Sequence, residues 1–489
     1  MKHGEARPGT EDAPMHPAGG SAEDAARYGP APVLGLREAI TLIVGLVIGA
    51  GIFKAPSMVA QFAPSPGWMF AAWLLGGAVS LIGALCYAEL TTAYAHPGGD
   101  YHFLQRAYGR SVSFLFGWAR FSVITTGSIA LLAFVFGDYM NQALPLPALV
   151  GLPGSALYAL LSVAALSWVN LRGIRAGTSA QAWLTGLEVT GLLLIVAAGL
   201  ALVGADATPA REAAAAGTAP AAGFGAFGLA MVFVLLTYGG WNEAAYLSAE
   251  VRHRSRNMVR ALVGSIAIIT VLYLMVTWAY WQGLGQAGMA RSEALAADLL
   301  RLAFGPVGEV AIAVMVALAA LTSMNATMIV GARTSYAMGR DWPRLERLGF
   351  WDRERGTPVF ALQVQAAAAL LLVVLGAWTG SGFKAMVEFT APVFWLFFLM
   401  SGVALFVLRW REPTVERPFK VPLYPLLPLL FCATCAYMLW SSLSYVYSQS
   451  LGGFNAAWIG VGVLCAGFVL LLLVGLRPTR PRMIPSQTP

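Results

Sequence analysis

Long apolar runs separated by short polar connections fill the chain from residue 36 onward. A transmembrane helix needs about 20 predominantly apolar residues, and each run is long enough to cross a bilayer. Twelve runs are present, at residues 39–61, 67–93, 112–140, 153–171, 180–204, 225–248, 260–284, 306–335, 358–378, 384–409, 422–447 and 455–476. The pattern predicts an all-α integral membrane protein with twelve transmembrane helices in one domain, residues 36–480.

The two ends of the chain lack this pattern. Residues 1–35 are rich in Pro, Gly, Ala and acidic residues and show no periodicity, which predicts a disordered tail. A short tail, residues 481–489, follows the last run. We expect both tails in the cytoplasm.

Composition changes the picture by exclusion. Hydrophobic residues make up 58% of the chain and charged residues only 11%, whereas soluble domains carry about 25% charge. A soluble domain and a disordered chain are both excluded. No metal-ligand spacing, catalytic nucleophile constellation or phosphate loop is present, so we expect neither an enzyme nor a cofactor, a metal or ATP coupling.

The net charge of +7 reflects orientation if the N-terminus is cytoplasmic. The outer connections then hold only four basic residues, namely Arg211, Arg291, Arg301 and Lys384. Most other basic residues beyond the N-terminal tail lie in the inner connections and the C-terminal tail. This bias follows the positive-inside rule. It predicts that both termini lie in the cytoplasm and gives no reason to expect a nucleic acid partner. We expect the membrane to be a bacterial cytoplasmic membrane.

Glycines interrupt two runs near their middle. The first reads Val44-Gly45-Leu46-Val47-Ile48-Gly49-Ala50-Gly51-Ile52-Phe53, and the sixth reads Thr237-Tyr238-Gly239-Gly240-Trp241-Asn242-Glu243. Unwound backbone at membrane depth is tolerated where it is buried in protein or lines a cavity. Matching interruptions in two halves point to a transporter's binding site. The alternative is helix packing through a G-x-x-x-G pair, Gly45 and Gly49.

Each interrupted run opens a block of five. The blocks cover residues 36–204 and 225–409, and two extra helices follow in 422–476. This predicts broken helices 1 and 6 at the centre of the protein. Free N–H groups would hold a carboxylate and free carbonyls an ammonium, so a zwitterion suits the site.

Five stretches in order resemble the amino acid–polyamine–organocation superfamily, its bacterial amino acid permeases and L-type amino acid transporters above all. They are Gly49–Phe53, Tyr87–Leu90 with Gly98–Tyr101, Tyr238–Asn242 continuing to Glu250, Asn325–Asp341, and Arg417–Pro422. The resemblance implies a five-plus-five inverted repeat, alternating access and an α-amino acid bound between spans one and six. Carried over by position, its contacts from span one are Val47, Gly49, Ala50 and Gly51. From span six they are Leu236, Tyr238 and Gly239, with Trp241 beside the break.

The chain departs from its relatives at three of these places. Many relatives have Ser where this chain has Ala50, which removes a hydroxyl contact to the carboxylate. L-type transporters place a gating aromatic residue where this chain has Leu236, so either a bulkier substrate is admitted or Phe233 gates instead. Several bacterial relatives carry a Lys tied to proton coupling where this chain has Glu188.

An intramembrane carboxylate such as Glu188 is by default a candidate functional group. Burial favours the neutral form of a carboxyl group, so this side chain could carry a proton. It could equally bind a cation, or pair structurally with an Arg or a hydroxyl. The sequence leaves coupling and structural pairing open.

Other polar residues within the runs have two interpretations each. Glu243 could read a cationic side chain, although bracing of the break through backbone N–H bonds is favoured. Glu89 is expected to pair with a nearby Arg. Lys54 and Arg120 are each expected to pair with an acidic residue among Asp138, Glu188 and Glu243. Two residues of span eight could bond toward span one or simply join helices, namely Ser323 and Asn325.

Three rival functions are weighed against amino acid transport. A polyamine transporter of the same fold would need carboxylates at the site. A non-transporting amino acid sensor would carry a large readout domain, which the short tails do not provide. An ion channel would show a repeated pore loop or a charged ring. No Cys lies in residues 141–154, where relatives join a glycoprotein heavy chain, so we expect no disulfide-linked heavy chain and a monomer or weak homo-oligomer.

Overall fold

The computed structural model describes residues 35–94, 99–149, 151–172, 178–203, 224–243, 251–352, 357–378, 382–448 and 456–475. Helices joined by irregular connections make up these ranges, and within them there are isolated bridges but no strands. The two predicted tails lie outside the described residues, apart from Gly35. The all-α prediction is confirmed for the described ranges.

The first half of the chain begins with the interrupted segment α2 (Leu36–Val47), η1 (Ala50–Phe53) and α3 (Ala55–Phe62). There follow α4 (Pro66–Ala93), α5 (Gly99–Tyr108), α6 (Arg110–Ala119), the π-helical turn η2 (Arg120–Thr125), α7 (Thr126–Ala143), α8 (Gly154–Leu171) and α9 (Thr178–Ala201). The elements α6, η2 and α7 form one continuous helix, which we call helix 110–143.

The second half begins with a second interrupted segment, α11 (Phe224–Thr237) and η3 (Trp241–Glu243). There follow α13 (Arg254–Arg291), α14 (Leu295–Asp341), η4 (Pro343–Leu345), α15 (Val359–Trp378), α16 (Gly382–Arg411), α17 (Leu426–Ser448) and α18 (Ala456–Gly475). Gly285 (φ 66°) bends the end of α13, and Gly305 (φ 69°) bends the start of α14. Both adopt the left-handed region that favours glycine.

Eight helices in the described ranges are long and apolar enough to cross a membrane: α4, helix 110–143, α8, α13, α14, α15, α16 and α17. Shorter apolar helices lie within α9 and α18, and the two interrupted segments divide into still shorter pieces. The membrane-protein prediction is confirmed, while the count of twelve spans stays a prediction.

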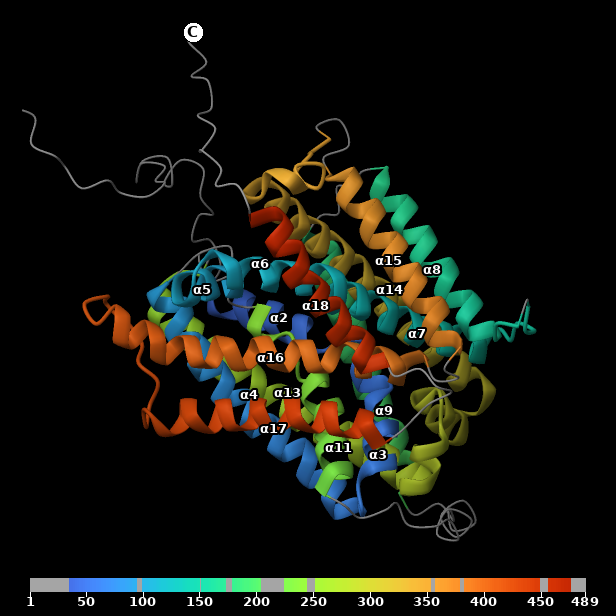
Figure 1. Cartoon of the computed structure of the whole chain (residues 1–489). Coiled ribbons are helices and arrows are strands. Elements are labelled where there is room, and N and C mark those ends of the chain that lie inside the picture. The colour runs from blue at the N-terminus through green and yellow to red at the C-terminus, as the bar shows by residue number, and fades with distance from the viewer. Residues whose placement is uncertain are drawn as a thin grey trace, which may run out of the picture.

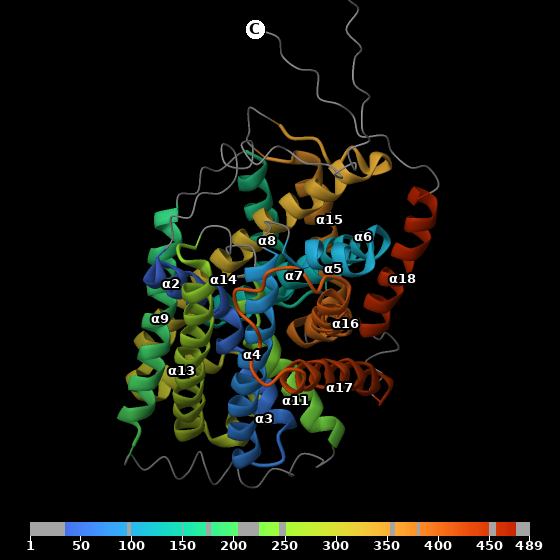
Figure 2. The same ribbon diagram turned by 90° about the vertical axis from the view of Figure 1, so that its left-hand side faces the viewer.

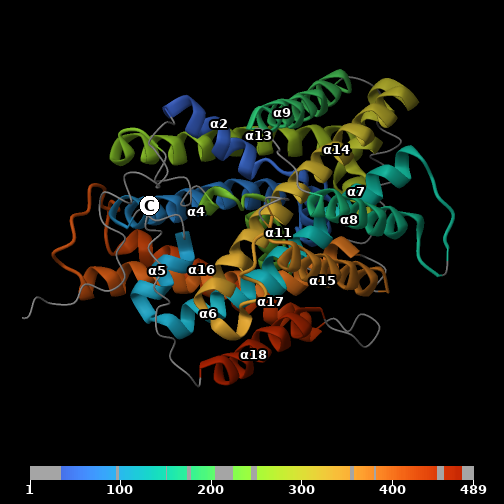
Figure 3. The ribbon, with the colours of Figure 1, turned by 90° about the horizontal axis from the view of Figure 1, so that it is seen from above.

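Helix 110–143 lies at the centre of the packing. Its α7 part packs against α14, α8, α16 and α15 (Figure 1). On one side of the molecule, α9 and α13 lie with α2, whereas α18 lies at the opposite side (Figures 2 and 3). A Cβ added to Gly137 of α7 would lie 2.0 Å from the Ser155 carbonyl oxygen, so α7 and α8 approach through glycine.

Candidate functional site

The first interruption separates two half-helices. Helix α2 ends at Val47, and Ile48 and Gly49 are extended, with ψ of 93° and −174°. The chain then forms the single turn η1 before α3 begins at Ala55. A helix end leaves its last carbonyls and its first N–H groups without intrahelical partners. The glycine-rich stretch therefore presents backbone donors and acceptors at one place.

The second interruption is built differently. Helix α11 ends at Thr237, and the Gly239 N–H bonds the Leu236 carbonyl oxygen at 3.0 Å, which closes a tight turn. Gly240 has a φ of 110°, a conformation that a residue with a Cβ adopts only under strain. Two successive glycines thus turn the chain out of the helix before η3.

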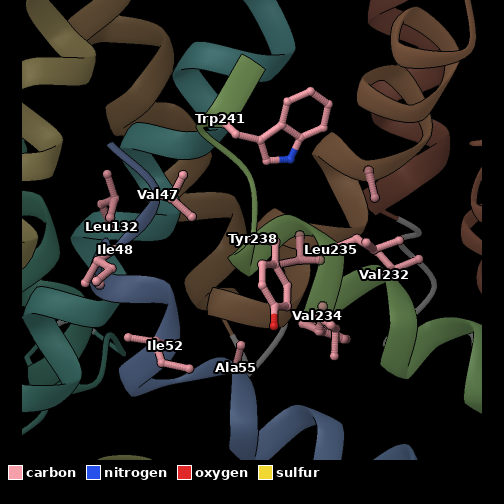
Figure 4. Packing of buried hydrophobic residues seen from close by; sticks show 14 of the residues in the cluster. Val47, Ile48, Ile52, Ala55, Leu132, Val232, Val234, Leu235, Tyr238 and Trp241 are labelled. Atoms are coloured by element: carbon pink, nitrogen blue, oxygen red, sulfur yellow. The ribbon is translucent and has the colours of Figure 1, made fainter. Parts of the chain in front are cut away.

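The two interruptions face each other (Figure 4). A Cβ on Gly51 would lie 3.6 Å from the Thr237 methyl group. The hydroxyl of Tyr273, on α13, lies 3.1 Å from the Val47 carbonyl oxygen and 3.2 Å from that of Thr237. These are the final carbonyls of α2 and α11. One fully buried tyrosine therefore bridges both breaks.

Sequence reasoning did not single out Tyr273. It is one of 16 tyrosines, and its run carries no glycine interruption or charge that would mark it. Only the packing of α13 against both α2 and α3 brings it to the breaks. The Tyr273 ring also packs against the ring of Tyr238, with the two centroids 5.1 Å apart.

The predicted contacts from span one lie at the break. Val47 and Ala50 are buried, and Gly49 and Gly51 flank Ala50. Leu236 is half-buried on α11. These residues lie at the place that the resemblance implies, and their assignment as ligand contacts stays a prediction.

The side chains of Tyr238 and Trp241 are engaged in packing on the two sides of the second break (Figure 4). The Tyr238 hydroxyl donates to the Trp73 carbonyl oxygen of α4 at 3.0 Å. The Trp241 ring meets Tyr87 of α4 and Phe398 of α16, with centroids 5.2 and 5.7 Å apart. The Tyr238 N–H is also bonded, to the Val234 carbonyl oxygen. The assignment of Tyr238 and Trp241 as substrate contacts stays a prediction.

Glu188 lies close to the first break. It is 3% exposed, and its carboxyl group lies beside Ser323 of α14. The Ser323 hydroxyl lies 3.8 Å from where a Cβ of Gly49 would stand. Among the described residues the Glu188 Oε2 atom has no hydrogen-bond partner. Glu188, Ser323 and Gly49 thus lie close together, and the role of Glu188 stays a prediction.

Asn325 bonds a neighbouring helix. It accepts a hydrogen bond of 2.7 Å from the side-chain amide of Asn170, which is buried on α8. This contact joins α14 to α8, which supports the interpretation of Asn325 as a link between helices. Ser323, two residues earlier, is the one that faces the first break.

The structure selects among the expected ion pairs. Lys54 pairs with Asp138 at 2.7 Å, and Arg120 pairs with Glu243 at 3.1 Å. Neither pairs with Glu188. Within the described ranges the Glu243 carboxylate pairs with a guanidinium, and bracing of the break through backbone N–H groups stays a prediction.

Glu89 has an arginine partner, as predicted. Its carboxylate accepts two hydrogen bonds from Arg409, at 2.7 and 2.5 Å, and Arg417 lies 3.5 Å away. The backbone N–H of Val421 bonds the same carboxylate at 2.7 Å. This group joins α4 to α16 and to the segment that precedes α17.

The sequence of this membrane protein with two broken helices is similar to known proteins along most of its length. Residues 34–471 match the amino acid permease family. The chain is 29% identical over 401 residues to the mouse b(0,+)-type amino acid transporter 1, covering 81% of this chain and 80% of the relative.

Two further relatives agree. The mouse Asc-type amino acid transporter 1 is 26% identical over 92% of this chain and 82% of its own. The human large neutral amino acids transporter small subunit 2 is 29% identical over 87% and 80%. This is a membrane transporter and not an enzyme. The chain belongs to the amino acid permease family, within the superfamily that its motifs resemble.

Proposed function

We propose that the protein carries α-amino acids across a membrane by alternating access, with the substrate held between its two interrupted segments. The observation that carries this is the Tyr273 hydroxyl within 3.2 Å of the final carbonyls of both α2 and α11. Paired interruptions are the membrane-protein form of a ligand site made of helix ends. The family of the chain and the printed names of its relatives support amino acids as the cargo.

The chemistry of the breaks suits a zwitterion. Backbone N–H groups from Gly49 to Gly51 would receive the carboxylate, since helix beginnings favour anions. The carbonyls of Val47 and Thr237 would accept from the ammonium. Leu236, Tyr238, Gly239 and Trp241 would complete the site from the second segment. No side-chain charge is required for these contacts.

The proposed architecture has twelve spans. Repeat one covers residues 36–204, repeat two covers 225–409, and two helices follow in 422–476. The interruptions at the start of both blocks support an inverted five-plus-five repeat. The charge bias of the connections supports two cytoplasmic termini in a bacterial inner membrane.

We propose that the protein works as a monomer or weak homo-oligomer, without a disulfide-linked heavy chain. One relative is named a small subunit. In this chain the four cysteines are Cys86, Cys432, Cys435 and Cys465, and none lies in the connection between α7 and α8. No sulfur is therefore present there for such a bond.

Uptake in proteoliposomes tests the substrate class. Labelled leucine uptake is competed with excess unlabelled leucine, alanine, arginine or putrescine. We expect amino acids with a free carboxylate to compete and putrescine to have no effect. A panel in which putrescine alone competes would overturn the proposal in favour of polyamine transport. The pairing of Glu243 with Arg120 argues against polyamines, because it occupies one of the carboxylates that they would need.

Ala50→Ser sharpens the site assignment. Ala50 is fully buried in η1, and a hydroxyl there would add one contact to the substrate carboxylate. A hydrogen bond to a charged group stabilises by about 1.5–3 kcal/mol, so we expect KM to fall roughly tenfold or more. Ala60→Ser on α3, equally buried but away from the break, is the control. Equal KM values for both variants would remove residue 50 from the site.

Glu188 is proposed to couple transport to protons. Its buried carboxylate with an unpartnered oxygen, beside Ser323, supports this role. Glu188→Gln keeps the size and removes the titration. We expect pH-driven uptake to be lost while counter-exchange of amino acids is kept. Unchanged pH dependence would remove Glu188 from the coupling step and leave the structural interpretation.

A further inference from the structure

Helix 110–143 carries two charged side chains in its interior, Arg120 and Asp138. They have opposite signs and are 18 residues apart, which is roughly 27 Å along an α-helix. Charges within spans are rare and face protein partners or water. Each of the two is paired, and the two partners belong to the two interrupted segments.

Asp138 pairs on one side of the site with Lys54, which lies between η1 and α3. The Nζ–Oδ2 distance is 2.7 Å, and the side chains are 6% and 13% exposed. Lys54 Nζ also donates to the Glu293 carbonyl oxygen at 2.5 Å. This pair fastens the half-helix α3 to helix 110–143 and to the connection between α13 and α14.

Arg120 pairs on the other side with Glu243, the last residue of η3. Its Nη2 atom lies 3.1 Å from both carboxylate oxygens, and the side chains are 10% and 31% exposed. Arg120 opens the π-helical turn η2, and such turns are frequent at functional sites. This pair fastens the end of the second interruption to the same helix.

The two pairs are arranged in a matching way. Lys54 lies five residues after Gly49, and Glu243 lies four residues after Gly239. Each therefore follows a glycine break closely, on the segment beyond it. Each pairs with a different end of one uninterrupted helix. An ordinary structural pair joins elements that stay together, whereas both of these pairs join a continuous helix to an interrupted one.

We propose that Lys54–Asp138 and Arg120–Glu243 are the outer and inner gating ion pairs of the transporter, and that they separate alternately. The inference rests on the alternating access proposed above. To open the site on one side, the segment beyond the corresponding break moves away from helix 110–143, and the pair on that side separates. The pair on the other side stays formed and keeps that side closed. In this structure both pairs are formed.

Side-specific cysteine labelling tests the inference without any substrate. The four native cysteines are replaced by Ala, and one reporter is added: Ala60→Cys on α3 or Ala39→Cys on α2, both buried. Vesicles of known orientation are treated with a membrane-impermeant thiol reagent from either side. Both reporters belong to the first interrupted segment, so they compare its two ends directly.

Opposite results are expected for the two pairs. Lys54→Met should raise labelling of the Ala60→Cys reporter from outside several-fold, because the outer pair is lost. Glu243→Gln should instead raise labelling of the Ala39→Cys reporter from inside. Rates that do not change, or that rise on the same side for both variants, would overturn the proposal. Arg301→Gln, which breaks a pair within α14 alone, and Arg106→Gln are the controls and should change neither rate.

Reversed pairs keep the test decisive if a single variant does not fold. Lys54→Asp with Asp138→Lys, and Arg120→Glu with Glu243→Arg, preserve the attraction with exchanged signs. We expect both double variants to restore the labelling pattern of the parent protein. Restoration of folding without restoration of labelling would show a structural pair only. A failure of amino acid uptake with this labelling intact would overturn the proposed substrate and leave the gating pairs standing.

Discussion

The two half-helices of the first interrupted segment, α3 on the side proposed as outer and α2 on the side proposed as inner, are held in different ways. On the outer side, polar bonds hold the half-helix α3 itself. Ser57 donates to the Ser292 carbonyl oxygen at 2.9 Å, and Gln61 donates to that of Ala290 at 2.7 Å. The side-chain amide of Gln286 donates two hydrogen bonds, to the carbonyl oxygens of Ala60 and Ala63. Six of the eight residues of α3 are buried.

On the inner side, the strongest polar bonds bypass the half-helix α2. Glu89 and Asp100 join α4 and α5 to α16. Helix α2 packs on α13 and α9. Among the described residues, α13 bonds its body through a long contact of 3.4 Å from Ser265 to the Ile40 carbonyl oxygen, and bonds its last residue, Val47, through Tyr273 at 3.1 Å. Ion pairs thus stabilise the surroundings of α2 rather than α2 itself.

This difference indicates which part moves first. Regions with few polar ties and exposed positions open at lower free energy than regions held by many buried bonds. Since α3 is bonded to the connection between α13 and α14, these bonds must break before α3 can move away. We expect the free energy needed to displace α2 to be smaller, so that under the proposed orientation inward opening would be the easier step. Four predictions test the comparison.

The largest effect is expected at Glu89. Glu89→Gln leaves the Arg409 and Arg417 guanidinium groups without a carboxylate at a position that is 1% exposed. Breaking a buried ion pair costs about 3–5 kcal/mol, so the thermal unfolding temperature in detergent should fall strongly. Glu412→Gln, in the exposed pair with Arg106, is the control and should cost less than about 1 kcal/mol. A similar loss in both variants would contradict the role of Glu89 as the inner anchor.

Asp100 gives the inner side a pH dependence. Burial raises the pKa of this carboxyl group to about 6, against hydrogen bonds from Tyr87 (2.6 Å) and Ser401 (2.9 Å) and the charge of Arg120. The folded state therefore holds the proton more tightly than the unfolded state. Stability should fall by roughly 3 kcal/mol as the pH rises from about 4 to 6, and stay level above it.

Asp100→Asn tests this dependence. The amide oxygen can still accept from both hydroxyls, which bond the same Oδ1 atom, but no charge forms. We expect the slope of thermal stability between pH 4 and 6 to shrink in the variant. An unchanged slope would assign the dependence to other carboxyl groups.

Tyr139 is the matching anchor of the outer side. Its hydroxyl donates to the Phe53 carbonyl oxygen at 2.8 Å and accepts from the Ala296 N–H at 3.2 Å. Tyr139→Phe would leave two buried groups unpaired, at about 2 kcal/mol. Tyr280→Phe is a matched control, because the Tyr280 hydroxyl is buried and has no partner among the described residues. Calorimetry of both variants should separate them; equal unfolding temperatures would count against the outer bond.

The smallest effects compare two serines. Ser57→Ala removes a 2.9 Å bond to α3's surroundings and should cost about 1 kcal/mol. Ser265→Ala removes only the 3.4 Å bond to α2 and should cost less than about 0.5 kcal/mol. Hydrogen exchange should show the same order, with α2 exchanging faster than α3. The reverse order would break the comparison between the two sides.

Much of this architecture could be predicted from the sequence. Apolar length located the eight long apolar helices of the described ranges, because lipid requires one long helix for each crossing. Glycines located both interruptions, since Gly240 adopts a backbone conformation open to few other residues. Charge pairing was predicted only as a set of alternatives. Which of the carboxylates Lys54 reaches depends on the position of α3 against helix 110–143, and no local pattern specifies that position.

Tyr273 and the turn η2 were not predictable at all. A tyrosine in an apolar run is indistinguishable by pattern from one at the membrane interface. A π-helical turn has the same composition as the helix around it. Both features arise from contacts between distant segments, and a single sequence shows no sign of those contacts.

The turn η2 has a consequence for the geometry of helix 110–143. In an uninterrupted α-helix, 18 residues make five full turns, so positions 120 and 138 would project in one direction. A π-turn holds about one extra residue, which offsets the two by about 100°. One continuous helix can then pair with two partners, Lys54 and Glu243, that lie in different directions. Deleting one residue from Phe121–Thr125 would leave a regular α-helix with the two charges 17 residues apart, which keeps the offset of about 100°; relatives that lack the turn should therefore be one residue shorter between Gly117 and Gly127.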